Sequence, residues 1–152
     1  MDKFLNLAIK EAKKGFTKKE GGPFGAVIVC GGKVIASAHN RVVKDNDPTA
    51  HAEINAIRKA SKKIKTFDLS KCELYTTCQP CPMCLFAIHW ARIKKIYYGA
   101  DSKDASKIGF DDKLLYEILN GKKRAVVKKQ KLPDAECVEL MEKYAKSKHK
   151  KY

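Results

Sequence analysis

The sequence predicts an α/β fold in one domain, with helices covering both faces of a five-stranded sheet. Predicted helices and strands alternate along the chain in the order α-β-β-α-β-α-β-α-β-α. The 152 residues are enough for one domain with a core and too few for two ordinary domains. Hydrophobic residues make up 44% of the chain, close to the average of folded globular proteins.

A helix and a β-hairpin are predicted at the start of the chain. Residues 2–14 repeat apolar side chains at helical spacing, with Asp2 in position to cap the first turn. Residues 24–30 are an apolar run rich in Val and Ile, which predicts a buried strand. Gly31-Gly32 is a two-residue turn signal, so residues 33–39 are expected to return as the second strand.

The middle of the chain alternates between helix and strand. A polar loop over 41–49 leads into a helix over 50–63, which is followed by a short strand over 72–77. Prolines mark the start of a third helix over 80–91, because proline is tolerated in a first helical turn. Another strand is predicted over 95–99.

The C-terminal third is more polar. Residues 101–112 are predicted to be a loop, and a helix over 112–119 follows it. Residues 125–132 are expected to form the fifth strand of the sheet. A helix over 134–146 and a basic tail over 147–152 complete the chain.

The charge of the chain is strongly positive. The 32 Lys and Arg residues against 17 Asp and Glu residues give a formal net charge of +15, which is a common feature of nucleic-acid-binding proteins. Only four of the basic residues are Arg, the side chain that makes bidentate contacts with phosphate and guanine. The excess of lysine over arginine therefore favours a solvated surface over a nucleic-acid-binding one. Residues 122–152 alone carry a net charge of +7.

The apolar segments and the cysteines indicate a cellular location. No stretch approaches the roughly 20 apolar residues of a membrane span, and the N-terminus shows no signal-peptide pattern, so we expect a cytoplasmic protein. Six cysteines are too sparse for a disulfide scaffold. In a reducing compartment, clustered cysteines are more often metal ligands. Cys30, Cys72 and Cys137 lie in apolar patterns and are expected in the core.

Two short motifs carry the chemistry. The first is His51-Ala52-Glu53, and the second is Pro80-Cys81-Pro82-Met83-Cys84; both lie at predicted helix starts. Cys81 and Cys84 share a helical face, so with His51 they offer the nitrogen and sulfur ligands that zinc prefers. Three ligands leave a place for water, and Glu53 is close enough to exchange a proton with it. This combination is the signature of zinc nucleobase deaminases.

Other interpretations of these residues remain open. A thioredoxin-like redox pair leaves His51 and Glu53 without a role. An iron–sulfur cluster that also uses Cys78 would expect a fourth ligand at position 88, which is Ile. A structural zinc site closed by Cys78, within a non-catalytic nucleic-acid-binding module, is a further alternative.

Beyond these motifs, the sequence resembles the cytidine deaminase superfamily of zinc-dependent nucleobase deaminases and, within it, the small guanine deaminases. The resemblance covers nearly the whole chain, and the stretches that carry it are 21–27, 46–53, 78–84, 90–92 and 109–112. It implies a single deaminase domain over 1–152. The implied fold has three α/β/α layers around a mixed, five-stranded central sheet.

The resemblance also implies the residues of the site. One zinc ion per subunit is held by His51, Cys81 and Cys84, and the catalytic residues are Glu53 and Asp112. The residues expected to contact substrate are Phe24, Asn40, Ala52, Trp90 and Tyr152. Without the resemblance, Asn40 has the features of a turn residue, Asp112 of a helix cap, Phe24 and Trp90 of core residues, and Tyr152 of a frayed chain end.

The implied reaction is hydrolytic deamination of guanine to xanthine and ammonia, a step of purine metabolism. Zinc-bound hydroxide attacks C2, and Glu53 carries the proton. The family further implies a homodimer in which the segment from about 133 to 152 crosses to the partner subunit. The main rival is a tRNA adenosine deaminase, for which nucleic acid is the partner. Guanosine and ammeline are further candidate substrates.

Overall fold

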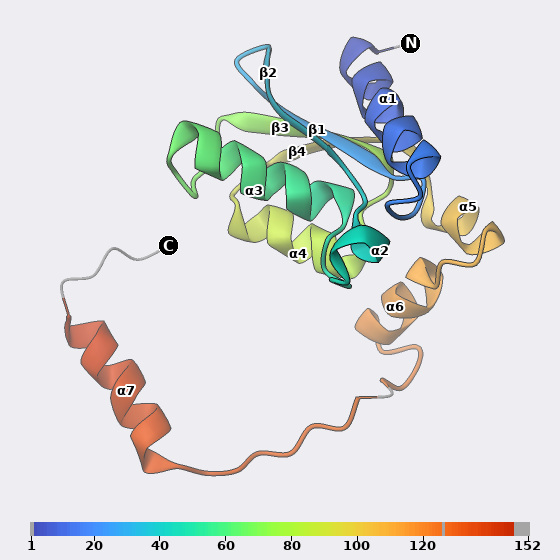
Figure 1. The fold of residues 1–152 in the computed structure, drawn as a ribbon. Coiled ribbons are helices and arrows are strands. Elements are labelled where there is room, and N and C mark those ends of the chain that lie inside the picture. Colours follow the sequence, from blue (N-terminus) through green and yellow to red (C-terminus); the bar gives the residue numbers. More distant parts are fainter. Residues whose placement is uncertain (1, 126, 148–152) are drawn as a thin grey trace.

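A four-stranded sheet forms the centre of the molecule in the computed structural model, which describes residues 2–125 and 127–147 (Figure 1). The strand order is β2-β1-β3-β4. β1 pairs antiparallel with β2 and β3, whereas β3 and β4 run parallel, so the expected mixed sheet is confirmed. The strands are β1 (Gly25–Cys30), β2 (Lys33–His39), β3 (Cys72–Cys78) and β4 (Lys95–Ala100).

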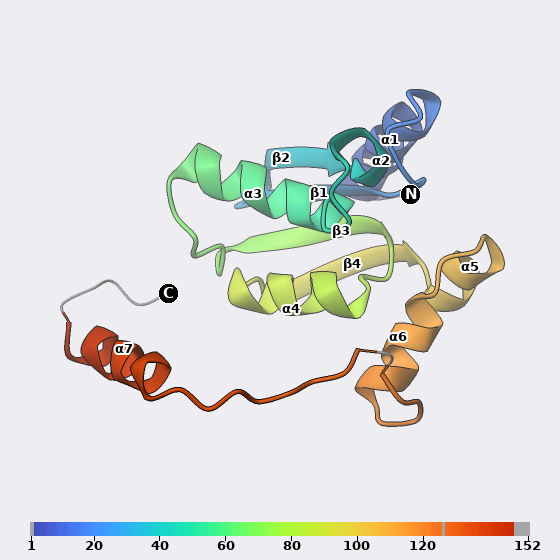
Figure 2. The same cartoon turned by 60° about the horizontal axis from the view of Figure 1, so that its bottom comes forward.

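Helices cover both faces of this sheet, which confirms the three-layer α/β/α fold. α1 lies on one face, and α3 and α4 lie side by side on the other (Figures 1 and 2). No helix among the described residues is both long enough and apolar enough to cross a membrane. The helices are α1 (Lys3–Thr17), α2 (Val42–Asp45), α3 (Ala52–Ile64), α4 (Pro82–Trp90), α5 (Ser102–Lys107), α6 (Asp112–Leu119) and α7 (Ala135–Lys146).

α1 packs closely on the first face of the sheet. The side chain of Asp2 caps the helix by accepting hydrogen bonds from the first-turn N–H groups. At Gly25 the backbone of β1 lies against the helix, because a Cβ atom there would be 2.1 Å from the carbonyl oxygen of Ala8. Val27, Val29 and Tyr75 complete this part of the core.

α3 and α4 form the second face of the core. α3 presents Ala52, Ala56 and Ala60 at four-residue spacing, and these small side chains let the helix lie close to the sheet. α4 contributes the buried Ile88. The first turns of both helices therefore lie at the end of the sheet where β3 ends.

The expected fifth strand over 125–132 is not formed by the described residues of that segment. Residues 127–134 are instead exposed and lead away from the sheet towards α7 (Figure 2). A strand needs a neighbour to pair with, and three lysines and Pro133 make this segment a poor partner for the edge strand β4. The sheet therefore has four strands and not five.

Two of the cysteines expected in the core form a disulfide. Cys30 and Cys72 face each other directly in the register of β1 and β3, with their Cα atoms 4.1 Å apart. Cys137, also expected in the core, is exposed on α7. Strand register joins cysteines that are 42 residues apart, so sequence spacing alone did not reveal the pair.

Candidate functional site

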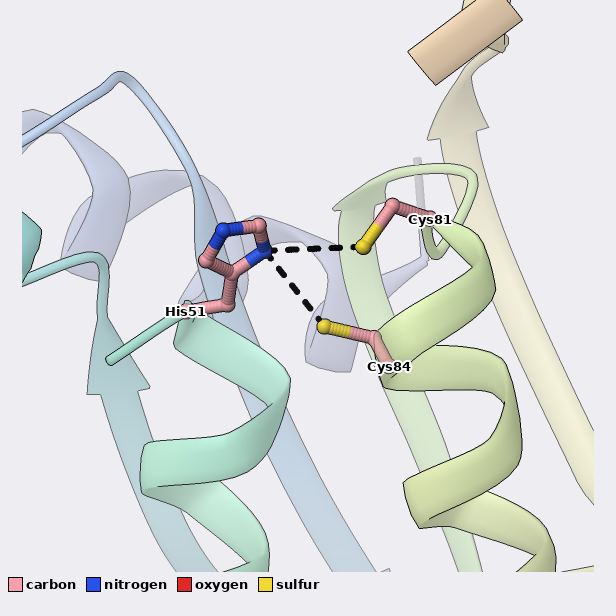
Figure 3. Close-up of side chains that lie close together, drawn as sticks. All are labelled: His51, Cys81 and Cys84. Carbon is pink, nitrogen blue, oxygen red and sulfur yellow. Dashed lines mark hydrogen bonds between the residues drawn. The ribbon is translucent and has the colours of Figure 1, made fainter. Parts of the chain in front are cut away.

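The candidate site lies where α3 and α4 begin. His51 is the residue immediately before α3, and Cys81 is the residue immediately before α4. Cys84 is one turn further along α4, so its thiol faces the same point as that of Cys81. Figure 3 shows one ring nitrogen of His51 directed at both sulfur atoms.

The geometry of these three side chains fits a zinc ion. The Nδ1 atom of His51 lies 3.6 Å from Sγ of Cys81 and 3.5 Å from Sγ of Cys84. Zinc bonds of about 2.3 Å to sulfur and about 2.0 Å to nitrogen, at tetrahedral angles, separate such atoms by about 3.5 Å. The ligand atoms of all three lie within 4.8 Å of one another. Among the described residues Cys78 does not join this group, which speaks against a closed four-ligand site.

The two thiols of the cluster differ in pKa. The hydrogen bond from Cys84, helped by the one from His51, lowers the pKa of Cys81 to about 4. The same contact with Cys81, together with burial, raises the pKa of Cys84. The hydrogen bond to Cys81 also raises the pKa of His51. The lowered pKa of Cys81 favours the thiolate form that metal binding requires.

Glu53 lies beside the cluster without belonging to it. It is only 5% exposed, and Oγ1 of Thr76 donates a hydrogen bond to its Oε1 over 2.9 Å. The thiol of Cys84 lies 3.5 Å from the other carboxylate oxygen. Burial raises the pKa of Glu53. A carboxyl group whose affinity for protons is raised in this way is suited to accept a proton and return it.

A small cavity opens beside these groups. The rings of Phe24 and Phe110 form an aromatic wall, edge to face, with their centres 4.8 Å apart. An aromatic wall combined with a few polar groups suits a flat heteroaromatic ligand. The residues that line the cavity are Phe24, Asn40, His51, Glu53, Cys78, Gln79, Cys81, Phe110 and Asp112.

Asn40 is fixed in the wall of this cavity. Its Oδ1 accepts hydrogen bonds from the N–H groups of Gly22 and Val42, at 3.3 and 3.1 Å. Neither of these hydrogen bonds uses the amide nitrogen. The side chain can therefore offer its N–H₂ group as a donor to a ligand in the cavity.

Asp112, the first residue of α6, lies at the same cavity and is half-buried. Burial, followed by the charge of Cys81, raises the pKa of its carboxyl group. Further along α6, the hydroxyl of Tyr116 donates a hydrogen bond to the carbonyl oxygen of Pro80, next to the ligand Cys81. This contact holds α6, and with it Asp112, against the loop that carries the metal ligand.

Two side chains expected at the substrate, those of Ala52 and Trp90, do not line this cavity. Ala52, the first residue of α3, has its side chain fully buried in the core. Trp90 ends α4, is 68% exposed, and lines an apolar groove with Ile57 and Phe67 instead. Tyr152 lies outside the described residues.

Sequence reasoning missed several residues that the structure places here. Thr76 bonds to Glu53 across the sheet, and no sequence signal predicts such a contact. Tyr116 lies one helical turn after Asp112, a spacing that places both on one face of α6. Phe110 is part of the 109–112 stretch that carries the family resemblance, so its place in the site had a sequence signal.

Comparison with protein families gives one match. The model described as the cytidine and deoxycytidylate deaminase zinc-binding region matches residues 1–100. This range includes His51, Glu53 and both cysteines of the cluster.

Individual proteins match over most of the chain. Guanine deaminase of Bacillus subtilis is 53% identical over 114 residues, which cover 75% of this chain and 73% of the relative. A tRNA-specific adenosine deaminase of Aquifex aeolicus is 40% identical over 144 residues, 94% of this chain and 92% of the relative. The X-ray structure of guanine deaminase from Bacillus subtilis matches with a TM-score of 0.91 and 41% identity, and covers 100% of this chain and 99% of that chain.

Proposed function

Because the chain belongs to the cytidine and deoxycytidylate deaminase zinc-binding family, we propose that it is a guanine deaminase. The proposed reaction is hydrolysis of guanine to xanthine and ammonia, which breaks a C–N bond of a cyclic amidine. The observation that carries the proposal is the buried Glu53 beside a His/Cys/Cys cluster, at a cavity that Asp112 also lines. The similarity to the guanine deaminase of Bacillus subtilis supports guanine as the substrate.

The proposed cofactor is one zinc ion, held by His51, Cys81 and Cys84. Their nitrogen and sulfur atoms are the donors that zinc prefers, and three protein ligands leave one position for water. When bound, zinc supplies the Lewis acidity that makes a water molecule nucleophilic near neutral pH.

Glu53 and Asp112 move the protons of the proposed reaction. Glu53 accepts a proton from the attacking water molecule while the oxygen of that water bonds to C2 of guanine. Asp112 assists the proton transfer at the ring nitrogen next to C2. Glu53 then returns its proton to the amino group on C2, the C–N bond breaks, and ammonia leaves. One water molecule is consumed for each ammonia released.

The remaining contacts orient the purine. Asn40 donates its amide N–H to an acceptor on the ring, and Phe24 packs against the ring. Ala52, whose side chain is buried in the core, contributes its main-chain N–H instead. It lies between His51 and Glu53, which both line the cavity, and the first N–H groups of a helix have no partner within that helix. Trp90 lies at the far end of α4 from Cys81 and does not line the cavity, so it is not among these contacts.

We propose a homodimer in which the segment from about 133 to 152 crosses to the partner and Tyr152 closes the partner's cavity. All twelve residues of α7 are exposed, and an isolated helix of this length is marginal in water. The outer side of α4 also exposes Met83, Phe86 and Trp90 at helical spacing. A second subunit would cover both apolar surfaces, and the solved relative matches this chain through α7.

Replacing Val138 and Met141 by Asp is expected to convert the dimer into monomers, because both side chains lie on the apolar face of α7. Light scattering coupled to gel filtration gives the mass directly. Glu139→Gln, on the polar side of the same helix, serves as the control and is expected to remain dimeric. A wild-type protein of 17.1 kDa in solution would contradict the dimer.

A substrate panel tests guanine against the related small molecules. We expect kcat/KM for guanine to exceed the values for guanosine, ammeline, adenine and cytosine by about 100-fold, since a pocket with fixed polar groups rejects ligands that leave those groups unpaired. Ammonia release measures all five substrates in the same way. A higher kcat/KM for any of the other four would overturn guanine as the substrate.

A tRNA adenosine deaminase is the second candidate. The similarity to the relative from Aquifex aeolicus extends over 94% of this chain, and the net charge of +15 suits a nucleic-acid substrate. The guanine deaminase is 53% identical over 114 residues, against 40% over 144 residues for the tRNA enzyme. Its solved structure also matches the whole chain with a TM-score of 0.91, which favours the free purine.

The proposal places the enzyme in the cytoplasm. Cys81 and Cys84 bind metal only as reduced thiols, which a reducing compartment maintains. The Cys30–Cys72 bond lies at the opposite end of β1 and β3 from the cavity, so its redox state is not expected to change the cluster. Fractionation with detection of the native chain tests the location.

A further inference from the structure

A buried histidine lies directly before Asn40 and takes no part in the proposed reaction. His39, the last residue of β2, is 6% exposed, and each of its ring nitrogens contacts a carboxylate. Nδ1 lies 3.0 Å from Oε2 of Glu11, and Nε2 lies 2.7 Å from Oε2 of Glu20. Gly15 makes room for the ring, because a Cβ atom there would be 2.5 Å from it. His39 thus joins α1, the loop after α1, and β2.

Both carboxylates are held in the ionised form. Hydrogen bonds from Lys44 and His39 lower the pKa of Glu20 to about 2, although Glu20 is only 7% exposed. Burial acts against ionisation of Glu11, but the hydrogen bond from His39 and nearby lysine charges lower its pKa. The ring of His39 therefore bridges two carboxylates, one at each of its nitrogens. The other charged groups around the three residues are Lys14, Arg41, Lys44, Asp45 and Lys59.

Glu20 connects this cluster to Asn40. Its main-chain carbonyl accepts a hydrogen bond from Lys44 N–H, and Gly21 and Gly22 follow it in the chain. A Cβ atom on Gly21 would lie 2.1 Å from Oδ1 of Asn40, so this loop presses against the amide oxygen. Gly22 N–H donates to the same oxygen. Val42 N–H is the other donor to this oxygen, at 3.1 Å. The loop that follows Glu20 and Val42 together therefore set which end of the Asn40 amide meets the cavity.

We propose that His39 is a positioning residue for substrate binding: it clamps Glu11 and Glu20 so that the Gly21-Gly22 loop holds the amide oxygen of Asn40 and directs its N–H₂ group at the purine. The inference rests on the proposed function, in which Asn40 binds the substrate. An Asn40 side chain released from this loop could turn its oxygen towards an acceptor on the ring, where it would repel the substrate.

A double-mutant cycle tests whether His39 acts through Asn40. His39→Gln is expected to raise KM for guanine roughly 3- to 10-fold, the range for one net hydrogen bond, while kcat and zinc content stay near wild type. The double variant His39→Gln/Asn40→Ala is expected to match Asn40→Ala alone. Asp45→Asn breaks the adjacent ion pair with Arg41 and is the control, with KM unchanged. Should His39→Gln fail to fold, Glu20→Gln probes the same clamp and is expected to raise KM as well.

The outcomes separate the inference from the proposed function. If Asn40→Ala raises KM but His39→Gln only lowers the melting temperature, His39 is merely structural and the inference is overturned. Additive effects in the double variant would overturn it too. If Asn40→Ala leaves KM unchanged, the substrate contact of the proposed function fails, and the inference fails with it.

Discussion

Glu53→Gln is expected to lower kcat on guanine by roughly 10²- to 10⁴-fold, the usual contribution of a general acid–base group, while one zinc ion per chain remains bound. Gln has the shape of Glu, and its amide oxygen can still accept the hydrogen bond from Thr76. The variant loses only the ability to take up and return a proton. Steady-state kinetics together with zinc analysis of the same sample measure both quantities.

Thr76→Val is the matched control for this prediction. It removes the hydroxyl that orients Glu53 but leaves the carboxylate in place. The loss of one hydrogen bond predicts a decrease in kcat of only about 2- to 10-fold. Full activity of Glu53→Gln would rule out the proposed proton transfer, and loss of zinc from that variant would show that Glu53 supports the metal site instead.

Cys84→Ser is expected to abolish both zinc binding and turnover. Cys84 is fully buried between His51 and Glu53, and a serine hydroxyl at that position neither ionises readily nor matches the preference of zinc for sulfur. The expected zinc content is close to zero after dialysis, with no measurable ammonia release.

Two further cysteine variants serve as controls for the loss of zinc and turnover in Cys84→Ser. Cys137→Ser changes the exposed thiol of α7 and is expected to keep zinc and activity. Cys78→Ser is expected to keep zinc, because Cys78 does not belong to the cluster of three. Loss of zinc from Cys78→Ser would favour the closed, four-ligand structural site, whereas a Cys84→Ser protein that retains one zinc ion would contradict the proposed ligand set.

Local signals in the sequence were sufficient for most of the fold. A glycine turn predicted the return strand over 33–39, and a helix over 112–119 was predicted to stop at Asn120-Gly121. Strand β2 and helix α6 have these bounds in the structure. The loop predicted over 101–112 contains the short helix α5. Asp101 and Asp104 form a capping box there, and these two aspartates three residues apart were an available signal.

Features that depend on partners distant in the sequence were harder to predict. The run over 125–132 has strand-forming residues at its start but no neighbour to pair with, and the Cys30–Cys72 bond depends on strand register. The zinc motif was different, because His51, Cys81 and Cys84 each lie at a helix start, where a short motif determines the local geometry. Trp90 shows the limit of this reasoning, since it lies at the far end of α4, is 68% exposed and does not line the cavity.

The most direct test supplies guanine and tRNA separately to the purified, zinc-loaded protein and measures both products. The proposed function predicts that guanine is converted to equal amounts of xanthine and ammonia, and that no inosine forms in the tRNA. Inosine in the tRNA without ammonia release from guanine would contradict guanine deamination and identify the chain as a tRNA adenosine deaminase.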